Sequence, residues 1–267
     1  MKLGIGTYSL TWSIGVPDYP SPSKPMTAES LLETASSLGL RVVQYADNLP
    51  LHLMDEQRLA SLKTQADQLG IVLEVGTRGT TPELLLDYLK VAKAIGSSLV
   101  RTLITTADLS QAEMDLRSVL QHYEEEGVAI AIENHGLHKS SQLAAFFEKL
   151  NRSYVGCCLD TVNSFGTLEP PEQVIRSLAP YTINLHIKDF DIRRANHQMG
   201  FSVLGAPVGA GKLDLDFTLS ELGRHKKSPN AIIELWTPFQ GTVEETIRLE
   251  QEWLLQSAAY LKNRITE

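Results

Sequence analysis

The sequence alternates between short apolar runs rich in β-branched residues and longer amphipathic stretches of helical length. Four of the amphipathic stretches end at a glycine with an apolar run close behind it, at Gly39, Gly70, Gly96 and Gly127. Glycine accepts the left-handed conformation that ends a helix at little steric cost. This pattern predicts alternating strands and helices, which is typical of parallel sheets with right-handed crossovers.

The predicted elements form eight strand–helix units. We predict strands at Leu3–Ser9, Val42–Asp47, Val72–Thr77, Leu99–Leu103, Ala129–Asn134, Val155–Asp160, Ile183–Lys188 and Ala231–Trp236, with helices near 28–38, 55–69, 81–95, 109–126, 140–150, 170–179, 216–225 and 242–263. Eight units fit a closed (β/α)8 TIM barrel, which typically needs about 250 residues. An open doubly wound sheet is the alternative, but it usually carries a glycine-rich phosphate-binding turn after its first strand, and TYSLTWSIGV at 7–16 has none.

No linker or low-complexity tract divides the chain, so we expect a single barrel domain over residues 1–267. The longest irregular stretches, at 10–27 and 190–215, follow predicted strands. In TIM barrels the loops after the strands build the active site at the C-terminal ends of the strands. We therefore expect the functional residues at that end of the barrel.

Charge and composition narrow the class of partner. The net charge is −8, whereas nucleic-acid binders usually carry a basic domain or stripe, so we expect no nucleic-acid partner. No apolar run approaches the roughly 20 residues that span a bilayer, and the N-terminus resembles a first strand more than a signal peptide. The adjacent thiols of Cys157 and Cys158 fit buried strand positions and a reducing cytoplasm. The sequence leaves the oligomeric state open, a homo-oligomer included.

Four consecutive predicted strands end in side chains that bind metals. The runs AIAIE, VGCCLD, TINLH and NAIIE end at Glu133, Asp160, His186 and Glu234. A charge after such an apolar run is costly unless it is paired, hydrogen-bonded or bound to a metal. Three carboxylates and one imidazole that converge at a barrel mouth suit one divalent ion, Mn²⁺, Mg²⁺, Co²⁺ or Zn²⁺.

The motifs IENH, LDTVN, LHIKD and IIELW, with the later segment PVGAGKLDLDF, resemble the xylose isomerase-like TIM-barrel superfamily and, within it, the sugar (phosphate) isomerase/epimerase group. The resemblance extends over the whole chain, and its motifs are dense from residue 129 onward. It implies metal ligands at Glu133, Asp160, His186 and Glu234, with proton transfer by Glu133 and Glu234.

The implied enzyme is a divalent-metal-dependent isomerase or epimerase of carbohydrate metabolism. It would act on a small sugar, sugar phosphate or related polyhydroxy carbonyl compound by proton abstraction and an enediolate-type intermediate. The alternative is a metal-dependent dehydratase, a lyase, of an inosose- or dehydroshikimate-like substrate. An endonuclease-IV-like repair enzyme shares the fold but needs more histidines than the seven present and usually a basic groove.

Six further residues are predicted to bind the substrate. Asn163 stands where several epimerases of the group have a histidine, and the group also implies an arginine shortly after the H-x-K-D motif, at Arg193 or Arg194. Trp236 should point inward with Glu234, two residues away, and His135 should share the face of Glu133. The substrate-binding set is Asn163, Trp236, Arg194, His135, Tyr8 and Lys188.

Overall fold

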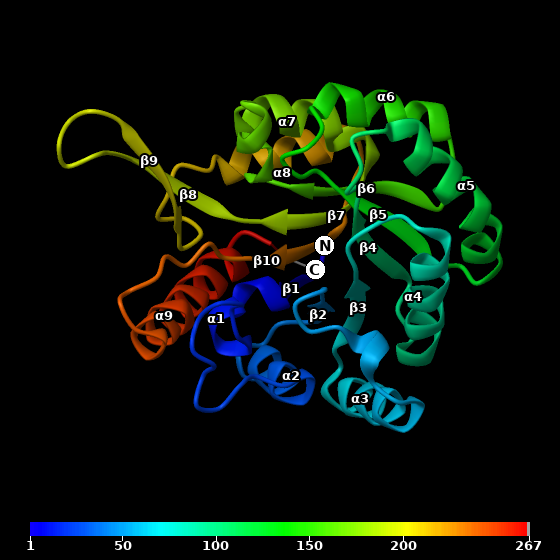
Figure 1. Cartoon of the computed structure of the whole chain (residues 1–267), viewed down its shortest axis with the longest axis horizontal. Coiled ribbons are helices and arrows are strands. Elements are labelled where there is room, and N and C mark those ends of the chain that lie inside the picture. The colour runs from blue at the N-terminus through cyan, green and yellow to red at the C-terminus, as the bar shows by residue number, and fades with distance from the viewer. Residues whose placement is uncertain (266–267) are drawn as a thin grey trace.

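The computed structural model describes residues 1–265 and forms a closed barrel of parallel strands surrounded by helices (Figure 1). Around the ring, the strands are β1 (Leu3–Gly6), β2 (Val42–Tyr45), β3 (Val72–Gly76), β4 (Leu99–Leu103), β5 (Ala129–Glu133), β6 (Val155–Asp160), β7 (Thr182–Ile187) and β10 (Asn230–Ile233). β10 pairs with β1 in parallel and closes the ring. The predicted (β/α)8 fold is confirmed.

One long helix follows each barrel strand. The helices are α2 (Ala28–Ser37), α3 (Glu56–Leu69), α4 (Pro82–Ile95), α5 (Leu109–Glu125), α6 (Ser140–Leu150), α7 (Pro171–Leu178), α8 (Leu215–Arg224) and α9 (Val243–Lys262). α3 and α4 end at Gly70 and Gly96, which have φ of 66° and 71°, as the glycine pattern predicts. None of the helices in residues 1–265 combines the length and apolar character needed to cross a membrane.

Alternate residues of each strand face the helices or the inside of the barrel. In β5, Ile130 and Ile132 belong to the main core that packs against the helices, whereas Ala131 packs with Leu99 and Cys158 in a separate small cluster. The two cysteines are free and buried, and Cys157 belongs to the main core while Cys158 does not. The small residues of β5 therefore lie on the inner face that ends at Glu133.

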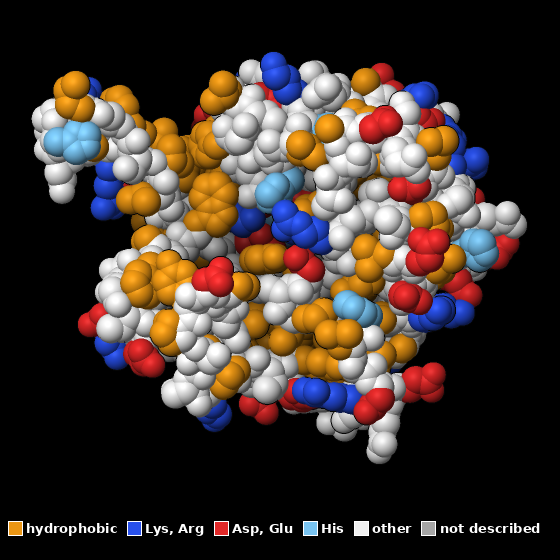
Figure 2. All heavy atoms as spheres, viewed as in Figure 1, with side chains coloured by type: hydrophobic (Ala, Val, Ile, Leu, Met, Phe, Trp, Pro, Cys, Tyr) orange, Lys and Arg blue, Asp and Glu red, His pale blue; other side chains and the backbone are white. Residues whose placement is uncertain are grey.

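The main difference from the predicted elements lies in the segment 190–215, which we predicted to be irregular. Together with Asp189 it forms β8 (Asp189–Arg194) and β9 (Phe201–Ala206), an antiparallel hairpin that projects from the barrel (Figure 1). Apolar side chains are exposed along the hairpin (Figure 2). Its apolar positions are interrupted by charged residues and glycines, so the strand pattern was too weak to recognise.

Asp189 fixes the chain where the hairpin returns to the barrel. Its carboxylate accepts hydrogen bonds from the backbone N–H groups of Gly209, Gly211 and Leu213, at 2.9, 3.0 and 2.9 Å. A Cβ atom at Gly211 would overlap this carboxylate and the carbonyl oxygen of Phe190. The segment PVGAGKLDLDF therefore needs glycine here to approach the end of H-x-K-D closely.

Candidate metal centre

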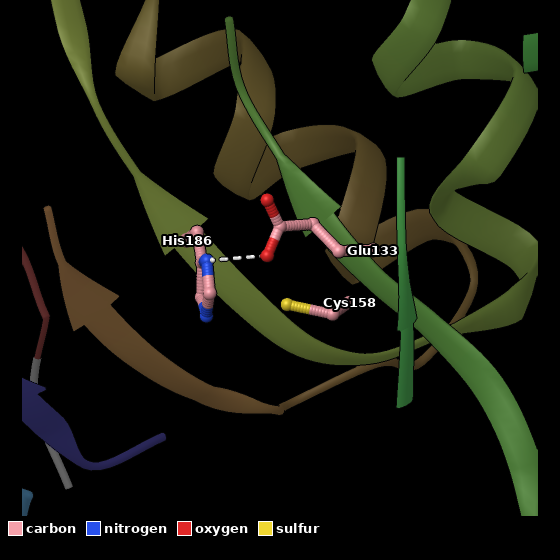
Figure 3. Close-up of side chains that lie close together, drawn as sticks. All are labelled: Glu133, Cys158 and His186. Carbon is pink, nitrogen blue, oxygen red and sulfur yellow. Dashed lines mark ion pairs between the residues drawn. The ribbon is translucent and has the colours of Figure 1, made fainter. Parts of the chain in front are cut away.

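The four predicted metal ligands lie together at the C-terminal ends of the strands. The Nδ1 atom of His186 is 3.2 Å from Oε2 of Glu133, 3.3 Å from Oε1 of Glu234 and 3.9 Å from Oδ2 of Asp160. All four residues are at most 3% exposed. Figure 3 shows Glu133 and His186 pointing toward each other from β5 and β7. That this cluster binds a metal stays a prediction.

The strand register explains the convergence. Asp160 ends β6 and is the Cα partner of His186 on β7, while Glu133 ends β5 one strand away. Glu234 directly follows β10, the other neighbour of β7. Inward positions on neighbouring parallel strands thus meet at one height of the barrel.

The donor atoms fit a divalent cation. The Nε2 atom of His186 lies 2.7 Å from the amide oxygen of Gln44, an acceptor, so Nε2 carries a proton, and in the neutral ring that binds a metal Nδ1 presents its lone pair toward the carboxylates. Among the described residues, Nδ1 of His186 and Oε1 of Glu234, 3.3 Å apart, are buried without a hydrogen-bond partner. Such unpaired acceptors facing one another are costly, and a shared cation would satisfy them.

Two basic side chains enter the same cluster. The ammonium of Lys188 is 2.8 Å from Oδ2 of Asp160 and 2.7 Å from Oε2 of Glu234. The guanidinium of Arg101, on β4, is 2.5 Å from Oε2 of Glu133 and 3.4 Å from Oδ1 of Asp47. Sequence reasoning missed Arg101. The signal was a charge inside the apolar strand LVRTL, the same burial problem that identified the carboxylates.

These opposite charges shift the titration of the cluster. Burial acts to raise the pKa of Glu133 and of Glu234. Arg101 and His186 nevertheless hold the pKa of Glu133 well below its usual range. His186 and Lys188 likewise lower the pKa of Glu234 to about 2. Burial acts to lower the pKa of His186, yet the surrounding acidic groups raise it well above its ordinary value. The site therefore favours positive charge, in keeping with a cation site.

Cys158 is a further candidate ligand that the sequence analysis did not select. The candidate ligand atoms form two groups of three, and within each group the atoms lie within 4.8 Å of one another. One group comprises Glu133, Cys158 and His186, and the other comprises Asp160, His186 and Glu234. Burial raises the pKa of the Cys158 thiol to about 11, and Sγ donates to Oδ1 of Asn184 at 3.3 Å. Because a thiol binds metals as the thiolate, the carboxylate–imidazole set is the better donor set.

A cavity of about 300 Å³ adjoins the cluster at Lys188. Three of the predicted substrate-binding residues, Tyr8, Lys188 and Trp236, line it. The Lys188 ammonium is 5.8 Å from the centre of the Trp236 ring. Asn163 lies against the cluster, because its Nδ2 donates to Oε1 of Glu133 at 2.6 Å. The structure thus brings four of the six predicted residues to the site, and their binding roles stay predictions.

The structure does not bring Arg194 to the cluster. The hairpin carries it away from the barrel, where its guanidinium lies 4.7 Å from the ring centre of Phe201. Its neighbour Arg193 pairs on the same hairpin with Asp191 at 2.7 Å. His135 is exposed in the loop after β5. In place of a hairpin arginine, the cluster contains Arg101 from a barrel strand.

The fold and this cluster define a TIM-barrel enzyme with a mixed carboxylate–histidine centre. Residues 32–257 match the family model described as xylose isomerase-like TIM barrel. The chain belongs to this family, and the predictions that it is a member of the family and an enzyme are confirmed.

The proteins similar to this chain include a decarboxylase, an epimerase and a protein solved in complex with magnesium. The chain is 32% identical over 270 residues to the 3-oxo-isoapionate decarboxylase of Pectobacterium atrosepticum, covering 99% of this chain and 96% of that protein. It matches D-psicose 3-epimerase from Clostridium cellulolyticum at 17% identity and a TM-score of 0.74, over 98% and 97% of the two chains. A Mycobacterium smegmatis protein of the same fold, solved with magnesium, has 15% identity and a TM-score of 0.71, over 96% and 97%.

Proposed function

We propose that this protein is a divalent-metal-dependent decarboxylase of a small polyhydroxy 3-oxo acid. The observation that carries the proposal is the pair of buried cations, Arg101 and Lys188, within the carboxylate–histidine cluster. An acid substrate brings one negative charge, and decarboxylation moves that charge to the carbonyl oxygen as neutral CO2 leaves, so these two cations and a bound metal ion would stabilise both states. Similarity to 3-oxo-isoapionate decarboxylase over nearly the whole chain supports the same reaction class.

Glu133, Asp160, His186 and Glu234 would hold the ion, and the oxygen-rich set suits Mn²⁺ or Mg²⁺. When bound, such an ion supplies a Lewis acid that polarises the substrate carbonyl. Lys188 lines the adjoining cavity and carries a positive charge toward the substrate. Loss of CO2 breaks one C–C bond and leaves its electron pair as an enolate, whose negative charge the ammonium of Lys188 would stabilise, and water would supply the proton that this carbon gains.

Isomerisation or epimerisation of a sugar or sugar phosphate is the second candidate. Glu133 and Glu234 approach His186 from different strands, an arrangement that could remove and return a proton on two sides of a substrate. These reactions, and dehydration, begin with proton abstraction by a base whose pKa should lie near the working pH. Ion pairs of Glu133 with Arg101 and of Glu234 with Lys188 make both carboxylates weaker bases, and this favours decarboxylation, which needs no such base.

The test is a substrate panel assayed with Mn²⁺. We expect CO2 release from polyhydroxy 3-oxo acids, with no epimer from ketoses and no conjugated product from inososes. Epimerisation without CO2 release would instead select the second candidate. Glu133→Gln should abolish turnover with the circular dichroism spectrum intact, whereas Glu221→Gln, a buried carboxylate of α8, should leave turnover unchanged. Full activity of Glu133→Gln would contradict the site assignment.

We propose that the reaction takes place in the cytoplasm, because both cysteines are free thiols buried in β6.

A further inference from the structure

We infer that Glu74, inside the barrel on β3, sets the tautomer of His186 and thereby prepares Nδ1 as a metal ligand. Glu74 is a positioning residue, since it reaches His186 through its hydrogen bond to Gln44. The inference rests on the metal centre of the proposed function but not on which reaction that centre catalyses.

Glu74 is surrounded by side-chain amides. It is 3% exposed, and its Oε2 accepts hydrogen bonds from Nδ2 of Asn184 at 3.0 Å and Nε2 of Gln44 at 2.9 Å. Its Oε1 accepts from Nδ2 of Asn230 at 2.7 Å. A carboxylate only accepts hydrogen bonds, so each of these amides must turn its NH2 group toward Glu74.

The orientation of Gln44 follows from these contacts. Asn184 directs its NH2 group at Glu74, so its Oδ1 is left as an acceptor. Nε2 of Gln44, which already donates to Glu74, donates its other hydrogen to this Oδ1, at 3.0 Å. Both N–H groups of Gln44 are then in use. Its Oε1 therefore faces Nε2 of His186, at 2.7 Å, and accepts the proton that this nitrogen carries.

This chain of contacts leaves His186 one way to bind a metal. A neutral imidazole carries one N–H, so a proton on Nε2 leaves the lone pair on Nδ1, the atom that faces Glu133, Asp160 and Glu234. Were Gln44 reversed, its NH2 group would face Nε2, and the proton would move to Nδ1. The lone pair of His186 would then point away from the carboxylates.

The test is Glu74→Gln, which keeps the shape of the side chain but lets it donate as well as accept. We expect Zn²⁺ to bind this variant about 10–100-fold more weakly in calorimetric titration, the range typical of changes in the hydrogen-bonded groups behind a metal ligand, because Gln44 is no longer held with its oxygen toward His186. Glu221→Gln, a buried carboxylate bonded to Arg176 and Arg224, is the matched control and should bind Zn²⁺ like the wild type. Equal affinity of Glu74→Gln and the wild type would overturn the inference.

The double variant Gln44→Glu/Glu74→Gln separates this role from a general loss of packing. It exchanges the carboxylate and the amide, so residue 44 can only accept from Nε2 of His186, and the correct tautomer no longer depends on residue 74. We expect Zn²⁺ affinity to return toward the wild-type value. Affinity as weak as that of Glu74→Gln alone would contradict the relay.

The wild-type protein gives a test that no folding defect can obscure. In the Zn²⁺-loaded protein, long-range ¹H–¹⁵N spectra should show His186 coordinated through Nδ1 with its proton on Nε2. Coordination through Nε2 would overturn the inference while leaving the proposed metal centre in place. A wild-type protein that binds no Zn²⁺ would overturn both.

Discussion

Replacing Lys188 with methionine tests whether the buried charges of the cluster depend on one another. Lys188 is 5% exposed, and its ammonium contacts Asp160 at 2.8 Å and Glu234 at 2.7 Å. Methionine fills similar space without charge. Removing one partner of a buried ion pair typically costs about 3–5 kcal/mol, because the other charge is left uncompensated.

For a domain of this size, about 1 kcal/mol shifts the Tm by roughly 2–4 °C, so metal-free Lys188→Met should melt roughly 6–20 °C below the wild type. The variant also releases oxygens of Asp160 and Glu234, two predicted metal ligands. A cation present at 100 times its Kd stabilises the folded state by about 2.7 kcal/mol. We therefore expect Mn²⁺ to raise the Tm of Lys188→Met by more than it raises that of the wild type.

The assay is differential scanning calorimetry of EDTA-treated protein, with and without Mn²⁺. Lys149→Met is the control, since Lys149 pairs with Glu113 on the surface, is 66% exposed, and should contribute about 0–1 kcal/mol. A metal-free Lys188→Met protein that melts with the wild type would refute the reasoning about buried charge. A smaller Mn²⁺ shift than in the wild type would refute the reasoning about shared oxygens.

Two further perturbations test other parts of the fold. Burial raises the pKa of Glu250 from 4.5 to about 7, so between these values the folded protein binds more protons than the unfolded one, and this group's contribution to stability falls as pH rises. Relative to Glu250→Gln, the wild type should lose about 3 kcal/mol of unfolding free energy from pH 4.5 to 7, measured by denaturant titration. A difference between the two proteins that stays constant with pH would contradict the raised pKa. Gly211→Ala should lower the free energy of unfolding by about 1–3 kcal/mol, because its Cβ meets Asp189. Gly223→Ala, in open space on α8, is the control and should raise it by about 0.5–1 kcal/mol. Equal Tm values for the two variants would count against the close approach of Gly211 to Asp189.

The sequence predicts the barrel and its mouth well because both depend on repeated local signals. Strand Leu99–Leu103 and strand Val155–Asp160 agree with the structure at both ends. The polar residues that end the runs AIAIE, VGCCLD, TINLH and NAIIE share one edge of the barrel by topology alone. The four predicted ligands could therefore be brought together without knowledge of any side-chain contact.

Residues whose role depends on a distant strand could not be predicted in this way. Glu74 and Arg101 each interrupt an apolar strand, in VLEVG and LVRTL, yet their partners lie on other strands and are set by register. For Arg194 the prediction failed in the opposite way, because a neighbour along the chain was expected to be a neighbour in space. It stands close to H-x-K-D in the sequence, but the β8–β9 hairpin takes it away from the barrel. Proximity along the chain is a weak guide once a loop forms structure of its own.

The central claim is that Glu133, Asp160, His186 and Glu234 bind one divalent cation. The most direct measurement is calorimetric titration of Mn²⁺ into EDTA-treated wild type and His186→Asn, both checked for folding by circular dichroism. We predict one ion bound per wild-type chain and no measurable binding by the variant. No binding by the wild type, or equal binding by the two proteins, would contradict the account.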